Sequence, residues 1–148
     1  MLIVKKFGGS SVADKERIFN VANRCIEDYK AGNQVVVVLS AMGKTTDGLL
    51  AKAADINPNA SKRELDMLLT TGEQVSVSLM AMAMGALGVP AVSLNAFQVK
   101  MHTTSVYGNS RLLRIDRERI EEELENNKIV IVTGFQGINK KDDYTTLG

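Results

Sequence analysis

The fold is indicated first by the opening stretch Leu2-Ile3-Val4-Lys5-Lys6-Phe7-Gly8-Gly9-Ser10-Ser11. A short apolar run reaches Lys6, and two glycines and two hydroxyl residues then lead into an amphipathic segment. This order predicts a strand over residues 2–7, a glycine turn and a helix. Because the apolar residues do not alternate cleanly with polar ones, we expect a parallel strand that is covered on both faces.

The glycine turn is also a candidate phosphate-binding loop. Glycines let the backbone approach an anion closely, N–H groups converge on its oxygens, and the N-terminus of a following helix favours negative charge. Lys6 would add a positive charge where a transferring phosphoryl group needs to be neutralised. The stretch matches neither the Walker spacing nor the dinucleotide fingerprint, so an ordinary strand-to-helix turn is the alternative interpretation.

The composition indicates one globular domain and excludes several classes of protein. The chain has 148 residues, 45% of them hydrophobic, and 18 basic against 17 acidic residues leave a formal charge of +1. This balance gives no electrostatic footprint for nucleic acid. The single cysteine, Cys25, excludes an internal disulfide framework and a multi-cysteine zinc site. With no secretory leader in the sequence, we expect a cytoplasmic protein.

One uncharged segment, from Val75 to Val99, needs a separate explanation. A membrane span requires about 20 consecutive, mainly apolar residues. Glycines, Pro90 and several polar side chains interrupt this segment. It therefore predicts a buried helix followed by a buried strand, and no contact with a membrane.

Alternating strands and helices predict the fold class. Residues 34–40 form the most β-branched run, and apolar residues from Ile18 to Tyr29 fall at helical spacing between this run and the first strand. Strand, helix and strand within 40 residues indicate a βαβ unit with a right-handed crossover. Further strands are predicted over 90–94 and 128–133. We therefore expect an α/β protein, a three-layer α/β/α sandwich with a mainly parallel sheet.

The segment that follows the second strand is a second candidate site. Ser40-Ala41-Met42-Gly43-Lys44-Thr45-Thr46-Asp47 leaves the carboxyl end of that strand, where ligands bind in open α/β sheets. Its hydroxyl groups are suited to hydrogen bonds with a polar substrate. A capped turn that opens the next helix is the alternative interpretation.

A break is predicted at Thr70-Thr71-Gly72-Glu73, between a helix that begins with a capping box at Ser61–Glu64 and an apolar helix that extends to Leu87. At the head of the second helix, the Glu73 carboxylate either caps the N-terminus or is held inward to bind an amine.

The rest of the chain gives weaker signals. Residues 95–110 are expected to be irregular, and His102 lacks an ordered set of partners for catalysis or metal binding. Residues 111–115 are a possible short strand. Asp116 is expected to cap a charged helix that buries Ile120 and Leu124.

Four motifs in register resemble the aspartate kinase family, a branch of the amino acid kinase superfamily. The resemblance extends from residue 1 to the end of the chain and favours aspartate kinases over acetylglutamate, glutamate and uridylate kinases. The motifs are Lys6-Phe7-Gly8-Gly9-Ser10-Ser11, Ser40-Ala41-Met42-Gly43 with Thr45-Thr46-Asp47, Leu68-Leu69-Thr70-Thr71-Gly72-Glu73-Gln74, and Gly134-Phe135-Gln136-Gly137.

The resemblance implies transfer of the ATP γ-phosphoryl group to the β-carboxylate of L-aspartate, the first step toward lysine, threonine, methionine and diaminopimelate. It places Lys6-Phe7-Gly8-Gly9-Ser10 at the phosphates, with Lys6 as the catalytic residue. It places Ser40, Ala41 and Thr46 at the aspartate, and Glu73 at its ammonium group. Because a carboxylate is already a nucleophile, positioning and charge neutralisation carry the reaction, with Mg²⁺ bridging the phosphate oxygens. No metal ion held by the protein's own side chains is expected.

The family pattern also implies that residues 1–148 are the N-terminal, amino-acid-binding part of a catalytic domain. In the family an Arg-Gly-Gly-Ser-Asp segment, a nucleotide-binding half and ACT regulatory domains follow, and the full-length enzyme is expected to be a homo-oligomer. We therefore expect this chain to lack activity on its own. Another member of the superfamily, or a non-catalytic aspartate-binding or assembly module, is the alternative.

Overall fold

The computed structural model describes residues 1–148 and contains two four-stranded sheets. The first sheet is entirely parallel, in the order β1-β2-β6-β3, and the second has the order β5-β4-β7-β8. The elements are β1 (Leu2–Phe7), the 3₁₀ helix η1 (Gly9–Val12), α1 (Lys15–Lys30), β2 (Gln34–Leu39), α2 (Thr45–Ile56), α3 (Lys62–Ala86), β3 (Ala91–Leu94), α4 (Ala96–Val99), β4 (Met101–Thr103), β5 (Leu112–Ile115), α5 (Glu118–Glu125), β6 (Ile129–Thr133), β7 (Gln136–Ile138) and β8 (Tyr144–Thr146).

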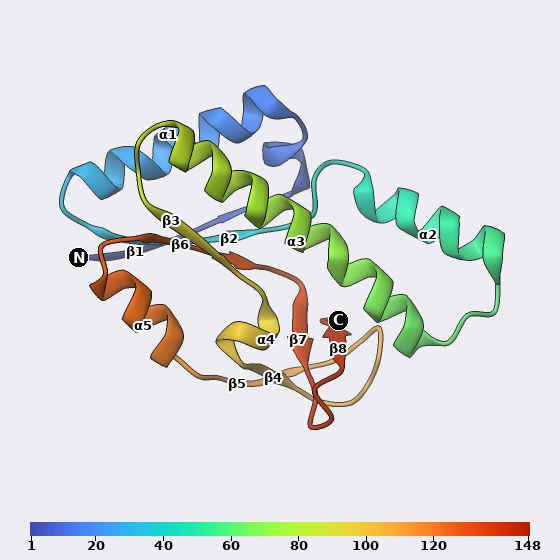
Figure 1. Ribbon diagram of the computed structural model, residues 1–148. Coiled ribbons are helices and arrows are strands. Elements are labelled where there is room, and N and C mark those ends of the chain that lie inside the picture. The colour runs from blue at the N-terminus through green and yellow to red at the C-terminus, as the bar shows by residue number, and fades with distance from the viewer.

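Helices cover both faces of the parallel sheet, so the predicted three-layer α/β/α arrangement is confirmed (Figure 1). On one face, α1 and α3 pack on β2 and β6 through a cluster of 16 buried residues that includes Cys25, Leu39 and Ile131. On the other face, α4 and α5 enclose a smaller cluster through Val99 and Leu124. Side chains from β2 and β6 alternate between the two clusters, which explains their continuous apolar sequences.

The first strand differs from its prediction because it lies at the edge of the sheet. Only one of its faces is covered: Phe7 packs against the larger core, whereas the side chains of Leu2 and Val4 on the other face are 54% and 63% exposed. The following helix is capped as expected, with the Asp14 carboxylate accepting the N–H of Arg17 at 2.9 Å.

The predicted break at residues 70–73 is wrong, because α3 runs without interruption from Lys62 to Ala86. Ser61 caps it by accepting the N–H of Glu64 at 3.3 Å, while the Glu64 carboxylate pairs with Arg63. The glycine in this segment allows close packing. A Cβ at Gly72 would lie only 3.0 Å from the Cβ of Ala41, so a larger residue would push the helix away from the loop after β2.

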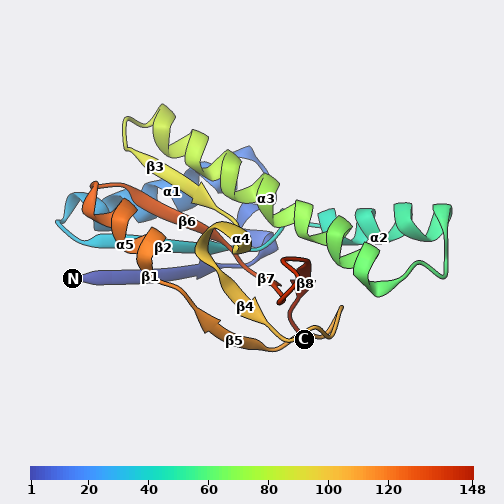
Figure 2. The ribbon, with the colours of Figure 1, turned by 60° about the horizontal axis from the view of Figure 1, so that its bottom comes forward.

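The second sheet was not predicted, and it continues directly from the carboxyl ends of β3 and β6 (Figure 2). Residues 95–110, expected to be irregular, contain α4 and β4. The predicted cap at Asp116 is also wrong: α5 has Arg117 at its N-cap, and the Asp116 carboxylate instead contacts His102 Nε2 at 3.2 Å. The possible strand at residues 111–115 is confirmed as β5. The other three strands of this sheet, β4, β7 and β8, are short and contain few apolar residues, so they gave no periodic signal.

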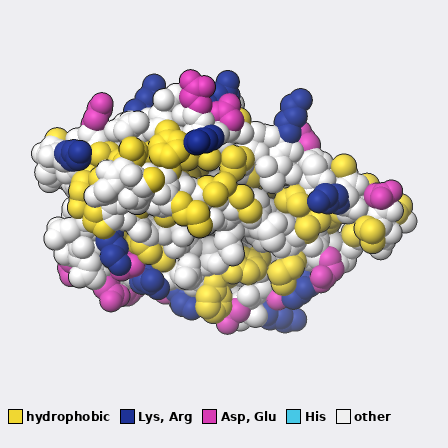
Figure 3. Space-filling model, turned by 45° about the horizontal axis from the view of Figure 1, so that its top comes forward, with side chains coloured by type: hydrophobic (Ala, Val, Ile, Leu, Met, Phe, Trp, Pro, Cys, Tyr) yellow, Lys and Arg dark blue, Asp and Glu magenta, His cyan; other side chains and the backbone are white.

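Two surface features stand apart from the core. The helix α2 projects from the body of the molecule and contains no buried residue (Figure 1). Between α1 and α3 the surface is apolar, and a groove there is lined by Phe19, Leu79 and Met82 (Figure 3). None of the helices combines the length and apolar character that crossing a membrane requires.

The close approach of β7 to β4 gives a test of this fold. A Cβ added at Gly137 would overlap Thr103 Cγ2 and lie 3.0 Å from the carbonyl oxygen of Met101. We expect Gly137→Ala to lower the free energy of unfolding by about 1–3 kcal/mol, because the two strands must separate. Gly85→Ala is the control, since a Cβ there meets nothing within 4 Å. In a helix this change should raise stability by about 0.5–1 kcal/mol in the same urea titration. Equal stability of the two variants would contradict the packing described.

Candidate functional site

A cavity of about 480 Å³ lies at the carboxyl ends of β1 and β2. The structure brings six of the predicted site residues together in its wall, from the ends of both strands, the first turn of α2 and the middle of α3. They are Lys6, Gly9, Ser40, Ala41, Thr46 and Glu73, and the wall is completed by Gly43, Phe135, Leu147 and Gly148.

The two loops of the site are held against each other by backbone contacts. The N–H of Gly43 donates to the carbonyl oxygen of Gly9 at 2.9 Å, and the N–H of Ser40 donates to that of Phe7 at 3.2 Å. A Cβ at Gly9 would lie 2.7 Å from the carbonyl oxygen of Ala41, a distance that side chains do not tolerate. The glycine is therefore required for the two loops to meet, and their contact fixes Lys6 and Ser40 on one cavity wall.

The loop after β1 differs in one respect from the predicted phosphate loop. The glycine turn leads into the four-residue 3₁₀ helix η1, and α1 begins only at Lys15, with its N-terminus capped by Asp14. The end of α1 is thus already neutralised by a carboxylate. The N–H of Gly8 donates to no group within the chain, so an N–H donor remains beside Lys6.

Glu73 is the buried acid of the cavity. Its side chain is 1% exposed, and burial raises its pKa from 4.5 to about 7, although a hydrogen bond from Gln136 lowers it in part. Because α3 is continuous, Glu73 does not cap a helix, which leaves the interpretation that it is held inward. A carboxylate kept from water gains most from an ionic partner that carries several N–H donors, such as an ammonium group.

The cavity therefore presents opposite charges on different elements. Lys6 from β1 and Glu73 from α3 are its charged side chains, and the hydroxyls of Ser40 and Thr46 lie between them in sequence. A ligand with both an ammonium group and anionic groups satisfies this arrangement. No group of three or more His, Cys, Asp or Glu side chains is placed to hold a metal ion.

Three predicted residues lie outside the cavity wall. The Phe7 side chain packs against the core, and neither Gly8 nor Ser10 lines the cavity, although both adjoin Gly9. His102 does not line this wall: it lies on β4, where its Nε2 contacts Asp116 at 3.2 Å and Arg114 at 3.4 Å.

Several lining residues were missed by sequence reasoning. Phe135 is 48% exposed and adopts φ 63°, a conformation that non-glycine residues rarely take, and Leu147 and Gly148 complete the same side. The motif Gly134-Phe135-Gln136-Gly137 was the available signal, because two glycines around an aromatic residue at the end of a strand indicate an unusual turn.

A buried carboxylate on α3 positions the part of the cavity wall that Leu147 and Gly148 form. Asp66 is 1% exposed and accepts three hydrogen bonds, from the N–H of Gly108 at 2.9 Å and from the N–H and hydroxyl of Thr146 at 3.0 and 2.8 Å. These bonds tie the end of β8 to α3, directly before Leu147. The sequence carried no clear signal for this role, because Asp66 lies among charged residues at the start of the helix and its partners are distant in the chain.

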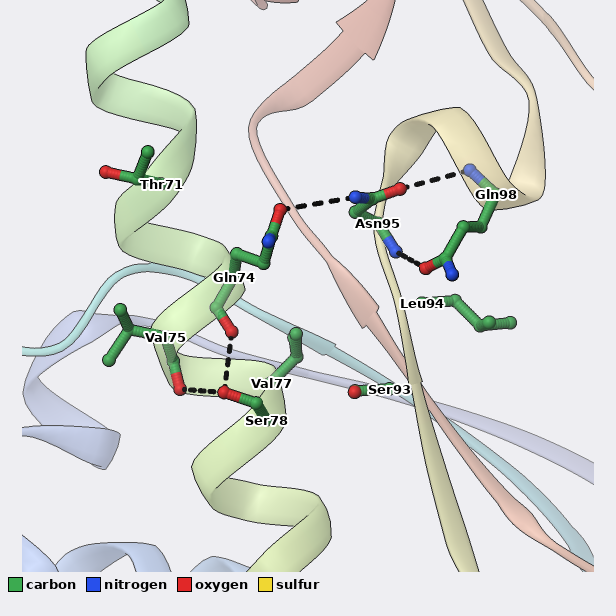
Figure 4. Close-up of a pocket in the computed structure, with 9 residues that line it drawn as sticks. All are labelled: Thr71, Gln74, Val75, Val77, Ser78, Ser93, Leu94, Asn95 and Gln98. Atoms are coloured by element: carbon green, nitrogen blue, oxygen red, sulfur yellow. Dashed lines mark hydrogen bonds between the residues drawn. The ribbon is translucent and has the colours of Figure 1, made fainter.

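A second pocket of about 470 Å³ lies between α3 and the segment from β3 to α4 (Figure 4). Its polar side chains mostly bond one another: Asn95 donates to Gln74 at 3.2 Å and forms a capping box with Gln98. No charged residue lines it, so it offers nothing to neutralise a phosphate or a carboxylate. The cavity that contains Lys6 and Glu73 is therefore the candidate site.

The burial of Glu73 predicts how stability depends on pH. Because the carboxyl has a pKa of about 7 in the folded chain and an ordinary value of 4.5, the folded state binds the proton more tightly between these values. The free energy of unfolding should therefore fall as pH rises from about 4.5 to about 7. Glu73→Gln should remove this fall and be more stable than the unsubstituted chain above pH 7, by about 3 kcal/mol.

Urea unfolding at pH 5 and pH 8 measures this difference. Glu125→Gln, which removes an exposed carboxylate at the end of α5, is the control and should follow the unsubstituted chain. The same pH dependence in the Glu73→Gln chain and the unsubstituted chain would show that the buried carboxyl is not responsible.

Comparison with known proteins gives matches over nearly the whole chain. The model of the amino acid kinase family matches residues 1–148. Aspartokinase from Bacillus sp. (strain MGA3) is 56% identical over 147 residues, and the match covers 99% of this chain and 36% of that protein. The chain thus spans about a third of the length of the curated relatives it matches.

Two solved structures have the same fold. Aspartate kinase from Synechocystis superposes with a TM-score of 0.84 at 45% sequence identity, covering 100% of this chain and 24% of that one. E. coli aspartokinase III in complex with aspartate and ADP gives a TM-score of 0.87 at 24% identity, covering 100% and 44%, which supports the fold alone. Since the family model extends over the whole sequence, the chain belongs to the amino acid kinase family.

Proposed function

We propose that this chain is the amino-acid-binding part of an aspartate kinase, which transfers the ATP γ-phosphoryl group to the β-carboxylate of L-aspartate. The observation that carries the proposal is the single cavity that combines Lys6, Ser40, Thr46 and the buried Glu73. Relatives of 49–56% identity over nearly the whole chain are aspartokinases.

Each side chain of the cavity has one role in this proposal. The Glu73 carboxylate binds the ammonium group of aspartate, and the hydroxyls of Ser40 and Thr46 donate to its carboxylates. Ala41, which is buried, presents backbone groups at the same end of the cavity. Because the β-carboxylate is itself the nucleophile, no general base is needed. Catalysis then depends on holding it in line with the phosphoryl group.

The loop after β1 is assigned to the phosphates of MgATP. Lys6 and the free N–H of Gly8 supply positive charge and a hydrogen-bond donor, as phosphate oxygens require. ATP supplies the phosphoryl group, and Mg²⁺ neutralises the phosphate oxygens. The chain has no carboxylate cluster for Mg²⁺, so the ion is assigned to the phosphates. E. coli aspartokinase III has been crystallised with aspartate and ADP, which supports this pair of ligands.

The match covers 36% of the first relative's length. We assign the remaining length of the relatives to further parts of the enzyme. We infer that residues 1–148 are the N-terminal part of the catalytic domain, and that a nucleotide-binding half and ACT regulatory domains accompany it in a cytoplasmic homo-oligomer. The 36% coverage of the relatives supports this division.

Binding of aspartate by the chain tests the assignment of Glu73. We expect calorimetry at pH 8 to detect L-aspartate but not succinate, which lacks the ammonium group. Glu73→Gln should weaken aspartate binding by about tenfold or more, because an ionic hydrogen bond contributes about 1.5–3 kcal/mol. Glu125→Gln should bind as the unsubstituted chain does. Equal binding of aspartate and succinate would contradict the assignment.

Activity requires a longer protein. The chain alone is expected to give no turnover with MgATP and aspartate. A fusion to the segment that follows the matched region in the Bacillus sp. (strain MGA3) relative should form aspartyl phosphate, trapped as its hydroxamate. Lys6→Met should lower kcat by about 10²–10³ in this fusion, as loss of one group that stabilises transition-state charge does elsewhere.

Lys5→Met is the matched control for this activity test. Lys5 is the preceding residue on the same strand, but it pairs with Asp28 of α1 on the opposite face of the sheet. Its loss should leave kcat nearly unchanged. Turnover by the unfused 148-residue chain, or preference of the fusion for another acceptor, would reject the proposed division or the proposed substrate.

A further inference from the structure

The carboxamide of Gln136 joins three elements behind the cavity. Gln136 lies in β7, is 1% exposed and uses both ends of its amide. Its Nε2 donates to the carbonyl oxygen of Thr70 at 2.9 Å and to Glu73 Oε1 at 3.4 Å. Its Oε1 accepts the N–H of Ala96 at 3.1 Å.

These partners determine which way the amide faces. Because the N–H of Ala96 can only donate, the carbonyl end of the Gln136 amide must face α4. The NH₂ end then faces α3, where both of its partners are acceptors. The Glu73 carboxylate thus receives a donor whose direction is fixed by two other hydrogen bonds.

We propose that Gln136 is a positioning residue of this site, whose carboxamide holds the buried Glu73 carboxylate in place and in its ionised form, ready for an ammonium group. This inference rests on the proposed function, in which Glu73 receives the ammonium group of the substrate. Gln136 does not line the cavity and touches no substrate in this proposal.

Apart from the backbone N–H of Glu73 itself, which also lowers the pKa of this carboxyl, the surroundings of Glu73 offer no second donor of this kind. Lys6 is the other charged side chain that lines the cavity. Asp66, the other buried acid of α3, accepts its hydrogen bonds from Gly108 and Thr146. Gln136 is the one side chain that donates a hydrogen bond to the Glu73 carboxylate. Burial opposes ionisation, and Gln136 provides the larger of the two hydrogen bonds that favour the charged carboxylate.

The test compares the Gln136→Met chain with the unsubstituted chain, which has a pKa of about 7 at Glu73. We expect the midpoint of the Glu73 carboxyl titration, followed by NMR with ¹³C-labelled glutamate, to rise to about 8 in the variant. Aspartate affinity should then fall about tenfold at pH 6.5 and less than twofold at pH 8.5. An unchanged carboxyl midpoint, or an equal loss of affinity at both pH values, would overturn the proposal.

The matched control is Gln74→Met. Gln74 is the next residue on α3 and carries the same amide, but it bonds Asn95 rather than Glu73. Its replacement should leave the Glu73 midpoint where it is. A rise as large as that in Gln136→Met would show that the loss of any amide near Glu73 has the same effect, and would count against the proposal.

A second measurement needs no variant. In the unsubstituted chain, the side-chain NH₂ resonances of Gln136 should shift with pH and share the midpoint of the Glu73 carboxyl. Resonances that stay constant across that midpoint would reject the contact. Both titrations are made without aspartate, so they decide the role of Gln136 even if the chain binds no aspartate and the proposed function fails.

Discussion

The structure depends on the close approach of three backbone segments around Ala41. The loop after β1 meets the Ala41 carbonyl through Gly9, and α3 meets the Ala41 side chain through Gly72. At both points a Cβ would come within about 3 Å of its neighbour, so glycine is the residue that permits the contact. This packing brings Lys6, Ser40 and Glu73 to one cavity although they are far apart in the sequence.

The parts of the fold that were predictable are those that bury continuous apolar surface. β2 and β6 follow from their continuous apolar runs and α1 from the helical spacing of its apolar residues, and all three belong to the main core. The error at residues 70–73 arose because Gly72 was interpreted as a break in a helix, whereas its role is steric and depends on Ala41, about 30 residues away. No local pattern contains that information. The short strands β4, β7 and β8 are held mainly by hydrogen bonds of buried polar groups, such as those of Asp66 and Thr103, which likewise have no periodic signal.

For the candidate site, the residues that line the cavity were largely predictable, but the residues that support them were not. Six residues of the cavity wall were assigned to the site from the sequence, because residue type and chain order are enough to suggest phosphate and ammonium groups. The supporting residues Gln136 and Asp66 were given no role, since they act through other residues and their chemistry is visible only once their partners are known. The wrong prediction for Asp116 has the same cause. Its position before α5 suits a helix cap, but its carboxylate contacts His102, a partner that the sequence does not reveal.

The lack of buried residues in α2 has a consequence for motion. A helix without a fully buried side chain loses less when it separates from the body, so we expect its local opening to cost less free energy than global unfolding. Thr46 lies in the first turn of this helix and forms part of the cavity wall. One part of the cavity wall is thus attached to α2, and we expect the amide hydrogens of this helix to exchange faster than those around Glu73 in α3. A ligand that spans the two walls would order α2, and part of its binding free energy would be spent on that ordering.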